Sequence, residues 1–393
     1  MKAVRGTLAA DDADHSPYTF FTMRLKRLEQ WWKKLWIRVL VRLMRRPSAG
    51  ERPDWAARSQ RVLFLRHDRA GDMIVSTGVM RAIARSHPTI VMDVFASPAN
   101  AAILRSAPYV RETIVFDRKK LSSYLPTCLR LRRARYDAVI DCMVTAPSVT
   151  TLLLILASGA RFRIGIAGRG NDAAFNIAVP GDARPDAHMV DLLAALAAAF
   201  DVDPNTIERR PTIDLTDDEF VRAETVWGAP VDARRVLVNI SAGGADRRWP
   251  DDNFVAVIEH VHAREPGAVV RIIAAPTEQT DAEAIAKRAG ATVVRTPSIR
   301  DALALVATAD LVLSPDTSIV HAASAFRTPC VAMYRKGSPD RWRLYDTPGA
   351  NVENIERTLV TLPLDRVLSA IDEQLDRAIE RGRVGDASLG KAR

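Results

Sequence analysis

Residues 62–72 read Val-Leu-Phe-Leu-Arg-His-Asp-Arg-Ala-Gly-Asp, and this stretch decides the fold. Its four leading apolar residues predict a buried strand over 62–66. Gly71 then permits a tight turn into a helical pattern over residues 73–86. The next apolar run, residues 90–96, predicts a second strand. A strand, a helix and a strand in this order indicate a parallel βαβ unit.

The same alternation continues along the chain in two sets. The first set adds strands at 113–116, 138–142 and 162–166, and the second has strands at 236–240, 269–274, 292–294, 311–313 and 330–334. Helical patterns lie between them, including residues 299–308. We therefore expect an α/β protein with two Rossmann-like halves that face a cleft. Ligands in such sheets bind beyond the carboxyl ends of the strands.

The chain of 393 residues is long enough for two domains of ordinary size. We expect a disordered tail at 1–16, a basic amphipathic helix and linker at 17–59, and a Rossmann-like domain at 60–180. A connector at 181–233 leads to a second Rossmann-like domain at 234–362, and a helix and tail occupy 363–393.

Charge is concentrated near the N-terminus. Between Phe20 and Arg46 lie nine basic residues and one acidic residue, so this segment carries +8 of the net charge of +9. The remainder is nearly neutral, which argues against a general nucleic-acid-binding surface. The segment has apolar residues at helical spacing, with Trp31, Trp32 and Trp36 among Lys33, Lys34 and Arg38.

This N-terminal segment has three interpretations. A basic amphipathic helix can bind a membrane surface, bind a partner protein, or pack on its own domain. Tryptophans beside clustered cations favour an anionic membrane surface. No apolar run reaches about 18 residues, and no signal peptide is evident. Three cysteines without short spacing indicate a reducing compartment with no disulfide framework and no zinc site. We therefore expect a cytoplasmic protein.

Three strand ends carry the residues that can do chemistry. After the first strand, Asp72 lies near a helix N-terminus, where it can cap the helix or face a bound acceptor; the residues alone favour an ordinary cap. No G-x-G-x-x-G motif follows this strand, so it is not a dinucleotide fingerprint. Residues 241–250 read Ser-Ala-Gly-Gly-Ala-Asp-Arg-Arg-Trp-Pro, in which Arg247 and Arg248 can neutralise phosphate or form a solvated loop. Glu278 is a ribose or sugar contact by position alone.

The third strand end, residues 311–321, gives the strongest signal. Thr317 and Ser318 can offer hydroxyl and N–H groups to a pyrophosphate at a helix N-terminus, and Asp316 can cap that helix. His321, one turn on, is by itself more often a buried, hydrogen-bonded residue than a catalytic one. No metal-ligand spacing is present, so we expect no metal.

Taken in order, these motifs resemble glycosyltransferase family 9, the lipopolysaccharide heptosyltransferases. The resemblance spans roughly residues 60–345. It is carried by Arg66…Gly71-Asp72, Arg247-Arg248-Trp249-Pro250, Asp316-Thr317-Ser318-Ile-Val-His321, Gly337-Ser-Pro-Asp-Arg-Trp342 and His188-Met-Val-Asp191. Three positions depart from the family pattern: Gly78 replaces proline, Arg247 replaces lysine and Ser318 replaces glycine.

The resemblance implies a GT-B fold, with acceptor bound by 60–180 and nucleotide sugar by 234–362. It implies inverting, metal-independent transfer without a cofactor, with Asp72 as the general base. The donor phosphates would be held by Arg247, Thr317 and Ser318. Donor-site support would come from Ser241, Asp316, His321 and Glu278, and the acceptor side from Arg66, Arg69 and Gly71.

We accordingly expect heptose transfer from ADP-heptose to a glycolipid acceptor of the Kdo–lipid A type, at the cytoplasmic face of the inner membrane. Two alternatives remain: a nucleotide-sugar epimerase on the same architecture, and a non-catalytic, membrane-associated nucleotide-sugar-binding protein.

Overall fold

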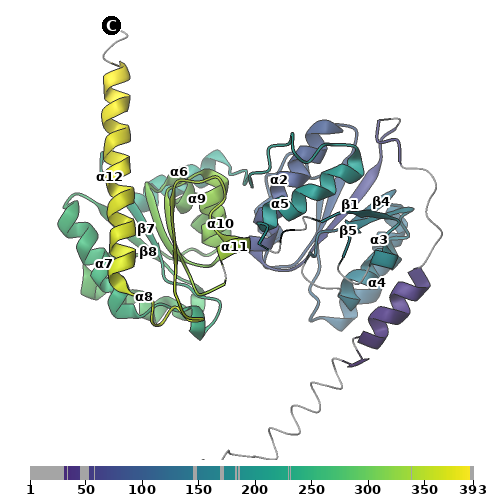
Figure 1. The fold of residues 1–393 in the computed structure, drawn as a ribbon, viewed down its shortest axis with the longest axis horizontal. Helices are drawn as coiled ribbons and strands as arrows, with labels where there is room; N and C mark the ends of the chain where they lie inside the picture. The colour runs from purple at the N-terminus through teal and green to yellow at the C-terminus, as the bar shows by residue number, and fades with distance from the viewer. Residues whose placement is uncertain are drawn as a thin grey trace, which may run out of the picture.

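The structure is a computed structural model that describes residues 31–32, 34–44, 53–56, 58–144, 148–168, 172–181, 184, 186–228, 230, 232–337 and 339–389, with side chains up to 377. The predicted tail at 1–16 lies outside the described residues, as does Lys33. Two α/β halves lie side by side, with the last helix on the outer side of the second half (Figure 1). The expected two-domain α/β fold is confirmed.

The first half is a parallel six-stranded sheet in the order β3-β2-β1-β4-β5-β6. Its strands are β1 (Arg61–Arg66), β2 (Val91–Ala96), β3 (Glu112–Val115), β4 (Ala138–Asp141), β5 (Phe162–Ile166) and β6 (Ile177–Val179). Its helices are α2 (Ala70–Ser86), α3 (Tyr124–Ala134), α4 (Val149–Ser158) and α5 (Met189–Ala194). Successive strand residues point to opposite faces. Accordingly Phe64 packs in one cluster with α2 and α5, whereas Leu65 packs in another with α3 and α4.

The second half repeats this plan in the order β12-β11-β10-β7-β8-β9. Its strands are β7 (Arg235–Asn239), β8 (Val269–Ile273), β9 (Thr292–Val293), β10 (Leu311–Pro315), β11 (Cys330–Tyr334) and β12 (Gly349–Glu353). Its helices are α6 (Asp217–Trp227), α7 (Asp251–Arg264), α8 (Gln279–Ala289), α9 (Ile299–Thr308), α10 (Ser318–Phe326), α11 (Pro339–Trp342) and α12 (Leu364–Leu389). Each half therefore has the doubly wound order 3-2-1-4-5-6. Short 3-10 turns, among them η1 (Ala101–Leu104), η2 (Leu121–Ser123), η5 (Ala245–Arg247) and η6 (Pro276–Glu278), join these elements.

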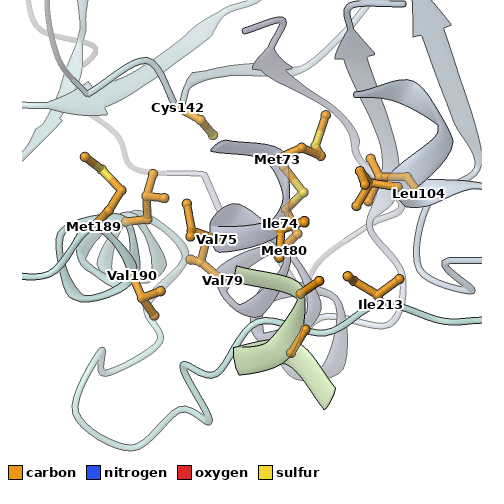
Figure 2. Packing of buried hydrophobic residues seen from close by; sticks show 14 of the residues in the cluster. Met73, Ile74, Val75, Val79, Met80, Leu104, Cys142, Met189, Val190 and Ile213 are labelled. Atoms are coloured by element: carbon orange, nitrogen blue, oxygen red, sulfur yellow. The ribbon is translucent and has the colours of Figure 1, made fainter. Parts of the chain in front are cut away.

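One hydrophobic cluster runs through both halves. Helix α2 contributes Met73, Ile74 and Met80 to it, and Met189 of α5 packs nearby (Figure 2). The cluster continues into α9 and α10 of the second half, and α2 packs directly against α10. The two halves therefore share part of their core.

The described part of the N-terminal segment, residues 31–32 and 34–44, is helical. Leu40 and Met44 are buried in the cluster that also holds α3 and α4. In contrast, Trp31, Trp32 and Trp36 are 56%, 48% and 51% exposed. The interpretation that this helix packs on its own domain is therefore confirmed for the side with Leu40 and Met44. The side that carries the tryptophans is exposed to solvent. No helix in the described part of the chain has the length and apolar character needed to cross a bilayer.

A buried arginine ties the two halves together. Arg300 of α9 is 1% exposed and forms an ion pair with Glu219 of α6. It also donates to the carbonyl of Ala102 at 3.1 Å and to Ser106 Oγ at 3.3 Å, both in the first half. A fourth bond, at 2.7 Å, goes to the carbonyl of Asp214 in the connector. We call this set the Arg300 clasp.

We expect Arg300→Met to lower the free energy of unfolding by about 3–5 kcal/mol, because it leaves the Glu219 carboxylate buried without its partner. Adding Glu219→Gln should restore part of the loss, since Gln keeps the helix-cap contact and carries no charge. Urea unfolding of both variants measures this. The matched control is Arg288→Met, whose pair with Asp252 is exposed and should cost less than about 1 kcal/mol. Equal losses at Arg300 and Arg288 would contradict the assignment.

Candidate active site

The three predicted motifs meet at one place. They follow β1, β7 and β10, beside the points where each sheet reverses its strand order, between β1 and β4 and between β7 and β10. Crevices form at such points in open α/β sheets. A cavity of about 690 Å³ lies there between the halves. It is lined by Arg69, Ala70, Gly71, Asp72, Gly243, Arg247, Asp316, Thr317, Ser318, His321, Arg335, Gly337, Asp340, Arg341 and Trp342.

Asp72 does not cap its helix. The N-cap of α2 is Arg69, which makes no side-chain capping bond, and Asp72 lies in the first turn. Its Oδ1 lies 3.3 Å from Nη2 of Arg66, whose Nε also donates to the Asp72 carbonyl at 2.8 Å. The interpretation of Asp72 as an ordinary cap is therefore wrong. Its carboxylate is 17% exposed and borders the cavity.

Arg66, expected on the acceptor side, is buried rather than at the cavity wall. It is 2% exposed, lies 3.4 Å from Asp68 as well as beside Asp72, and donates to the carbonyl of Cys142. It therefore orients the Asp72 carboxylate from behind. Arg69 and Gly71 do line the cavity, as expected for the acceptor side.

His321 fills the space where the halves touch. It is 5% exposed, and burial lowers its pKa, against the opposing effect of Asp316 and Asp72. Its ring centre lies 5.6 Å from that of Trp342. A Cβ on Gly71 would lie 2.8 Å from His321 Cδ2, so α2 approaches α10 this closely only with glycine at that position. His321 is thus the buried residue that its type predicts, and it also borders the cavity.

The N-terminus of α10 forms another part of the cavity wall. Thr317 is its N-cap and accepts from the backbone N–H of Ile319 at 3.3 Å, so the expectation that Asp316 caps this helix is wrong. Asn239 donates to Thr317 Oγ1 at 3.1 Å and holds it in place. Asp316 instead lies 3.4 Å from Nη1 of Arg247. A helix N-terminus beside a guanidinium is suited to an anionic group.

Three predicted residues lie away from the cavity wall. Ser241 Oγ accepts from the N–H of Ala275 at 2.6 Å, which fixes the loop after β7. Glu278 accepts from Arg248 Nη1 at 3.1 Å, and Arg248 also pairs with Asp251. The guanidinium of Arg248 is held by these acidic side chains and does not line the cavity, so its role at a phosphate stays a prediction. Glu278 is occupied in the same network, and its role as a sugar contact stays a prediction.

The segment after β11 supplies cavity residues that were not predicted individually. Arg335, Asp340, Arg341 and Trp342 all line the cavity. The 337–342 stretch of the resemblance was the signal that could have found them. With Arg69 and Arg247 they bring four guanidinium groups to one cavity. Arg247 pairs with Asp316 and Arg335 pairs with Asp246. Guanidinium groups are well suited to binding phosphate oxygens. In the described part of the chain, no group of three or more His, Cys, Asp or Glu side chains is arranged to hold a metal ion.

Two further carboxyl groups lie near Arg66, the partly buried Asp68 and the buried Asp141. Burial raises the pKa of Asp68 to about 6, although Arg66 opposes this. Burial likewise raises the pKa of Asp141 to about 7, opposed by the hydrogen bond from the N–H of Met143 at 2.8 Å. Both groups add negative charge to the surroundings of Arg66 when they ionise. Because the pKa values of both groups are raised, the negative charge around Arg66 forms at higher pH than it would with exposed carboxyl groups.

We expect Asp141→Asn to raise the free energy of unfolding at pH 8 by about 2–4 kcal/mol and to change it by less than about 1 kcal/mol at pH 4. The folded-state pKa lies above the ordinary 3.8, so the wild type loses stability as pH rises from about 4 to 7. The amide avoids this loss and still accepts from Met143. Urea unfolding across this pH range measures the effect, with the exposed turn residue Asp203→Asn as control. A gain independent of pH would contradict burial of the ionised carboxylate as the cause.

The family model for glycosyltransferase family 9 (heptosyltransferase) matches residues 128–362. A curated relative, the lipopolysaccharide core heptosyltransferase OpsX of Haemophilus influenzae, is 23% identical over 74% of this chain and 82% of its own length. Lipopolysaccharide heptosyltransferase 2 of Escherichia coli is also 23% identical, over 71% of this chain and 84% of its own.

Solved structures agree on the fold. A family 9 glycosyltransferase from Veillonella parvula has a TM-score of 0.71 at 15% identity, covering 81% of this chain and 98% of its own. ADP-heptose lipopolysaccharide heptosyltransferase II of Escherichia coli has a TM-score of 0.66 at 20% identity, covering 81% and 99%. The family match spans more than half of the chain and includes the Arg247 loop, the N-terminus of α10 and the segment after β11. The chain belongs to glycosyltransferase family 9 and is a glycosyltransferase.

Proposed function

We propose that this glycosyltransferase moves heptose from ADP-heptose to a lipopolysaccharide-core acceptor of the Kdo–lipid A type. The names of its relatives support the sugar and the acceptor class. The observation that carries the reaction type is the convergence of Asp72, from one half, with Arg247 and the N-terminus of α10, from the other, on one cavity.

The proposed reaction is a single inverting displacement. The donor diphosphate lies against Arg247 and the N–H groups at the start of α10, with the anomeric carbon turned toward Asp72. An acceptor hydroxyl forms the new C–O bond from the face opposite the nucleoside diphosphate, whose C–O bond breaks. The hydroxyl proton passes to Asp72, and the bond electrons leave with ADP.

Preorganised charge lowers the barrier of this displacement. The leaving diphosphate gains negative charge as its bond breaks, and guanidinium and N–H groups already in position stabilise it without reorganising. Arg247 is fixed by Asp316, and Thr317 by Asn239. In this proposal the guanidinium groups supply the positive charge, so transfer proceeds without a metal ion.

We expect Asp72→Asn to lower kcat by about 10²- to 10⁴-fold, because the amide cannot accept the proton, while the donor Kd stays within about twofold. The measurement is turnover of a panel of nucleotide sugars, ADP-heptose included, with Kdo–lipid A, together with donor binding by calorimetry. The matched control is Asp217→Asn, an exposed carboxylate in the first turn of α6, away from the cavity.

The panel also separates the alternatives. Conversion of a donor without acceptor would assign an epimerase, and binding without turnover of any donor would assign a binding protein. Full activity of Asp72→Asn would reject Asp72 as the base.

We also propose that the enzyme is peripheral on the cytoplasmic face of the inner membrane, docked through the N-terminal helix. The exposed side of residues 31–44 carries Trp32 and Trp36 together with the exposed cations Lys34 and Arg38. Because Leu40 and Met44 are buried, deleting the whole segment would open the core. Substitution of exposed residues is therefore the sharper test.

We expect Trp32→Ala with Trp36→Ala to weaken binding to vesicles of phosphatidylglycerol and phosphatidylcholine by roughly tenfold. The aromatic rings sit at the headgroup level, and their loss removes buried area without removing charge. Co-sedimentation of the full chain measures the change, and Phe220→Ala, a partly exposed aromatic on α6, is the control. Unchanged sedimentation of the double variant would count against docking through this helix.

A further inference from the structure

Helix α3 carries a second block of positive charge. Residues 118–135, from the end of β3 to just beyond α3, contain seven basic residues and no acidic one. These are Arg118, Lys119, Lys120, Arg130, Arg132, Arg133 and Arg135. Arg130 pairs at 2.6 Å with the partly exposed Glu112, which lies outside the segment. Acidic residues elsewhere in the chain cancel these charges, so the net charge does not reveal the block.

The same segment exposes a stripe of leucines. Leu121, at the start of η2, is 84% exposed, and Leu125 and Leu129 of α3 are 69% and 46% exposed. A spacing of four residues places successive side chains on one side of a helix. On the opposite side, Leu131 is fully buried. These leucines therefore form an exposed apolar stripe rather than singly scattered surface residues.

Neighbouring helices extend the apolar area. Helix α3 packs against α4, where Leu153 and Leu156 are 37% and 42% exposed. Leu40 of the N-terminal helix is buried in the same cluster as Leu131. Helices α3 and α4 and the N-terminal helix lie on the same side of the first half (Figure 1). We call the exposed leucines and cations of residues 118–135, with Leu153 and Leu156, the α3 face.

We propose that the α3 face is a lipid-docking surface, which inserts its leucines into an anionic bilayer while the surrounding arginines and lysines contact the headgroups. Helices that lie at a membrane surface typically expose aliphatic side chains among clustered cations. Surfaces for single-stranded nucleic acid combine cations with stacking aromatic side chains, whereas the exposed apolar residues of this stripe are all leucines. The charge is complementary to anionic lipid, and the leucines supply the apolar area.

The α3 face begins at the acceptor side of the cleft. Residue 118 follows β3 at the carboxyl edge of the sheet, the edge where the cavity lies. Arg118 is near enough to His67, which follows β1, to contribute to lowering the pKa of that imidazole, although burial is the main cause. His67 also forms a hydrogen bond with Thr151 of α4. The residues that follow β1 and β3 are therefore connected to α4. A bilayer on this face therefore lies beside the side of the cleft that Asp72 faces.

This inference rests on the proposed function in one respect, the glycolipid nature of the acceptor. It adds that docking does not depend on the N-terminal helix alone. The enzyme would sit on the membrane through its first half, and the donor half would stay in the aqueous phase.

The test uses the full chain and vesicles of phosphatidylglycerol with phosphatidylcholine, against vesicles of phosphatidylcholine alone. Leu121→Glu, Leu125→Glu and Leu129→Glu together should lower the partition onto the anionic vesicles by more than about tenfold. The matched control replaces three exposed apolar residues of the second half, Val221→Glu, Ile355→Glu and Val360→Glu, which are 64%, 76% and 53% exposed. The control should lose less than about twofold.

A charge variant provides an independent readout. Lys119→Glu, Lys120→Glu and Arg133→Glu should also lower the partition and should flatten its dependence on salt, because fewer cations contact the headgroups. Thermal melting of each variant should match the wild type, since the changed side chains are exposed. Vesicle binding equal to the wild type in both variants would overturn the proposal.

Activity distinguishes failure of this inference from failure of the proposed function. The leucine variant should lose transfer to acceptor held in vesicles and keep transfer to the same acceptor dispersed in detergent. Loss of vesicle binding with no transfer in either format, wild type included, would reject the proposed acceptor and leave the docking surface standing. Transfer that survives in vesicles with the leucine variant would overturn docking through α3. Tighter binding of the wild type to RNA than to vesicles, lost in the charge variant, would reassign the surface to nucleic acid.

Discussion

The close approach of two helix N-termini is the constraint on which the site depends. Helix α2 brings Asp72 from one half, and α10 brings Thr317 and Ser318 from the other. They meet where His321 packs over Gly71, a contact that any larger side chain would obstruct. Gly78, one of the three departures from the family pattern, has a similar cause. A Cβ there would lie 2.1 Å from the carbonyl oxygen of Arg209, because the connector crosses α2 at this point.

The electrostatics of the cavity follow from this geometry. Two helix N-termini and several guanidinium groups at one place repel each other unless negative charge lies between them. Asp316 beside Arg247 and Asp72 beside Arg66 supply part of that charge. A bound diphosphate would supply more negative charge at the N-terminus of α10, where the first backbone N–H groups have no intrahelical partners. The electrostatic repulsion within this arrangement therefore favours the anionic donor that we propose.

Much of the fold was readable because the buried strands are continuous apolar runs. The strands at 162–166 and 330–334 were predicted with their observed bounds, and the other predicted strands to within two residues. The missed strands β6 and β12 are edge strands, partly exposed, in which no run or alternation stands out. Each is held in its sheet by pairing with its neighbour, β6 with β5 and β12 with β11. Local sequence could not show this.

The site was readable at the level of motifs and less so at single side chains. Asp72 looks like a helix cap until the structure places Arg66 behind it, and Arg248 looks like Arg247 until Glu278 and Asp251 are seen around it. Both distinctions depend on partners 3 to 30 residues away in sequence. The α3 face was missed for another reason. A net charge sums over the chain, so a cationic block cancelled by distant acids leaves no trace in it.

The Arg300 clasp explains how such a site keeps its geometry. A buried ion pair adds little stability over apolar residues of the same size, so stability alone does not account for it. Its contribution is to fix the orientation of one half relative to the other. The shared hydrophobic cluster holds the halves together, but apolar contacts tolerate small sliding. The hydrogen bonds from Arg300 to the carbonyl of Ala102 and to Ser106 do not tolerate such sliding, because the strength of a hydrogen bond falls steeply with angle and distance. The proposed transfer, in which Asp72 of one half acts on an acceptor that attacks a donor held by the other half, needs atoms placed to within about half an ångström. The clasp thus fixes the register of the two halves, which the hydrophobic cluster alone would leave free to shift.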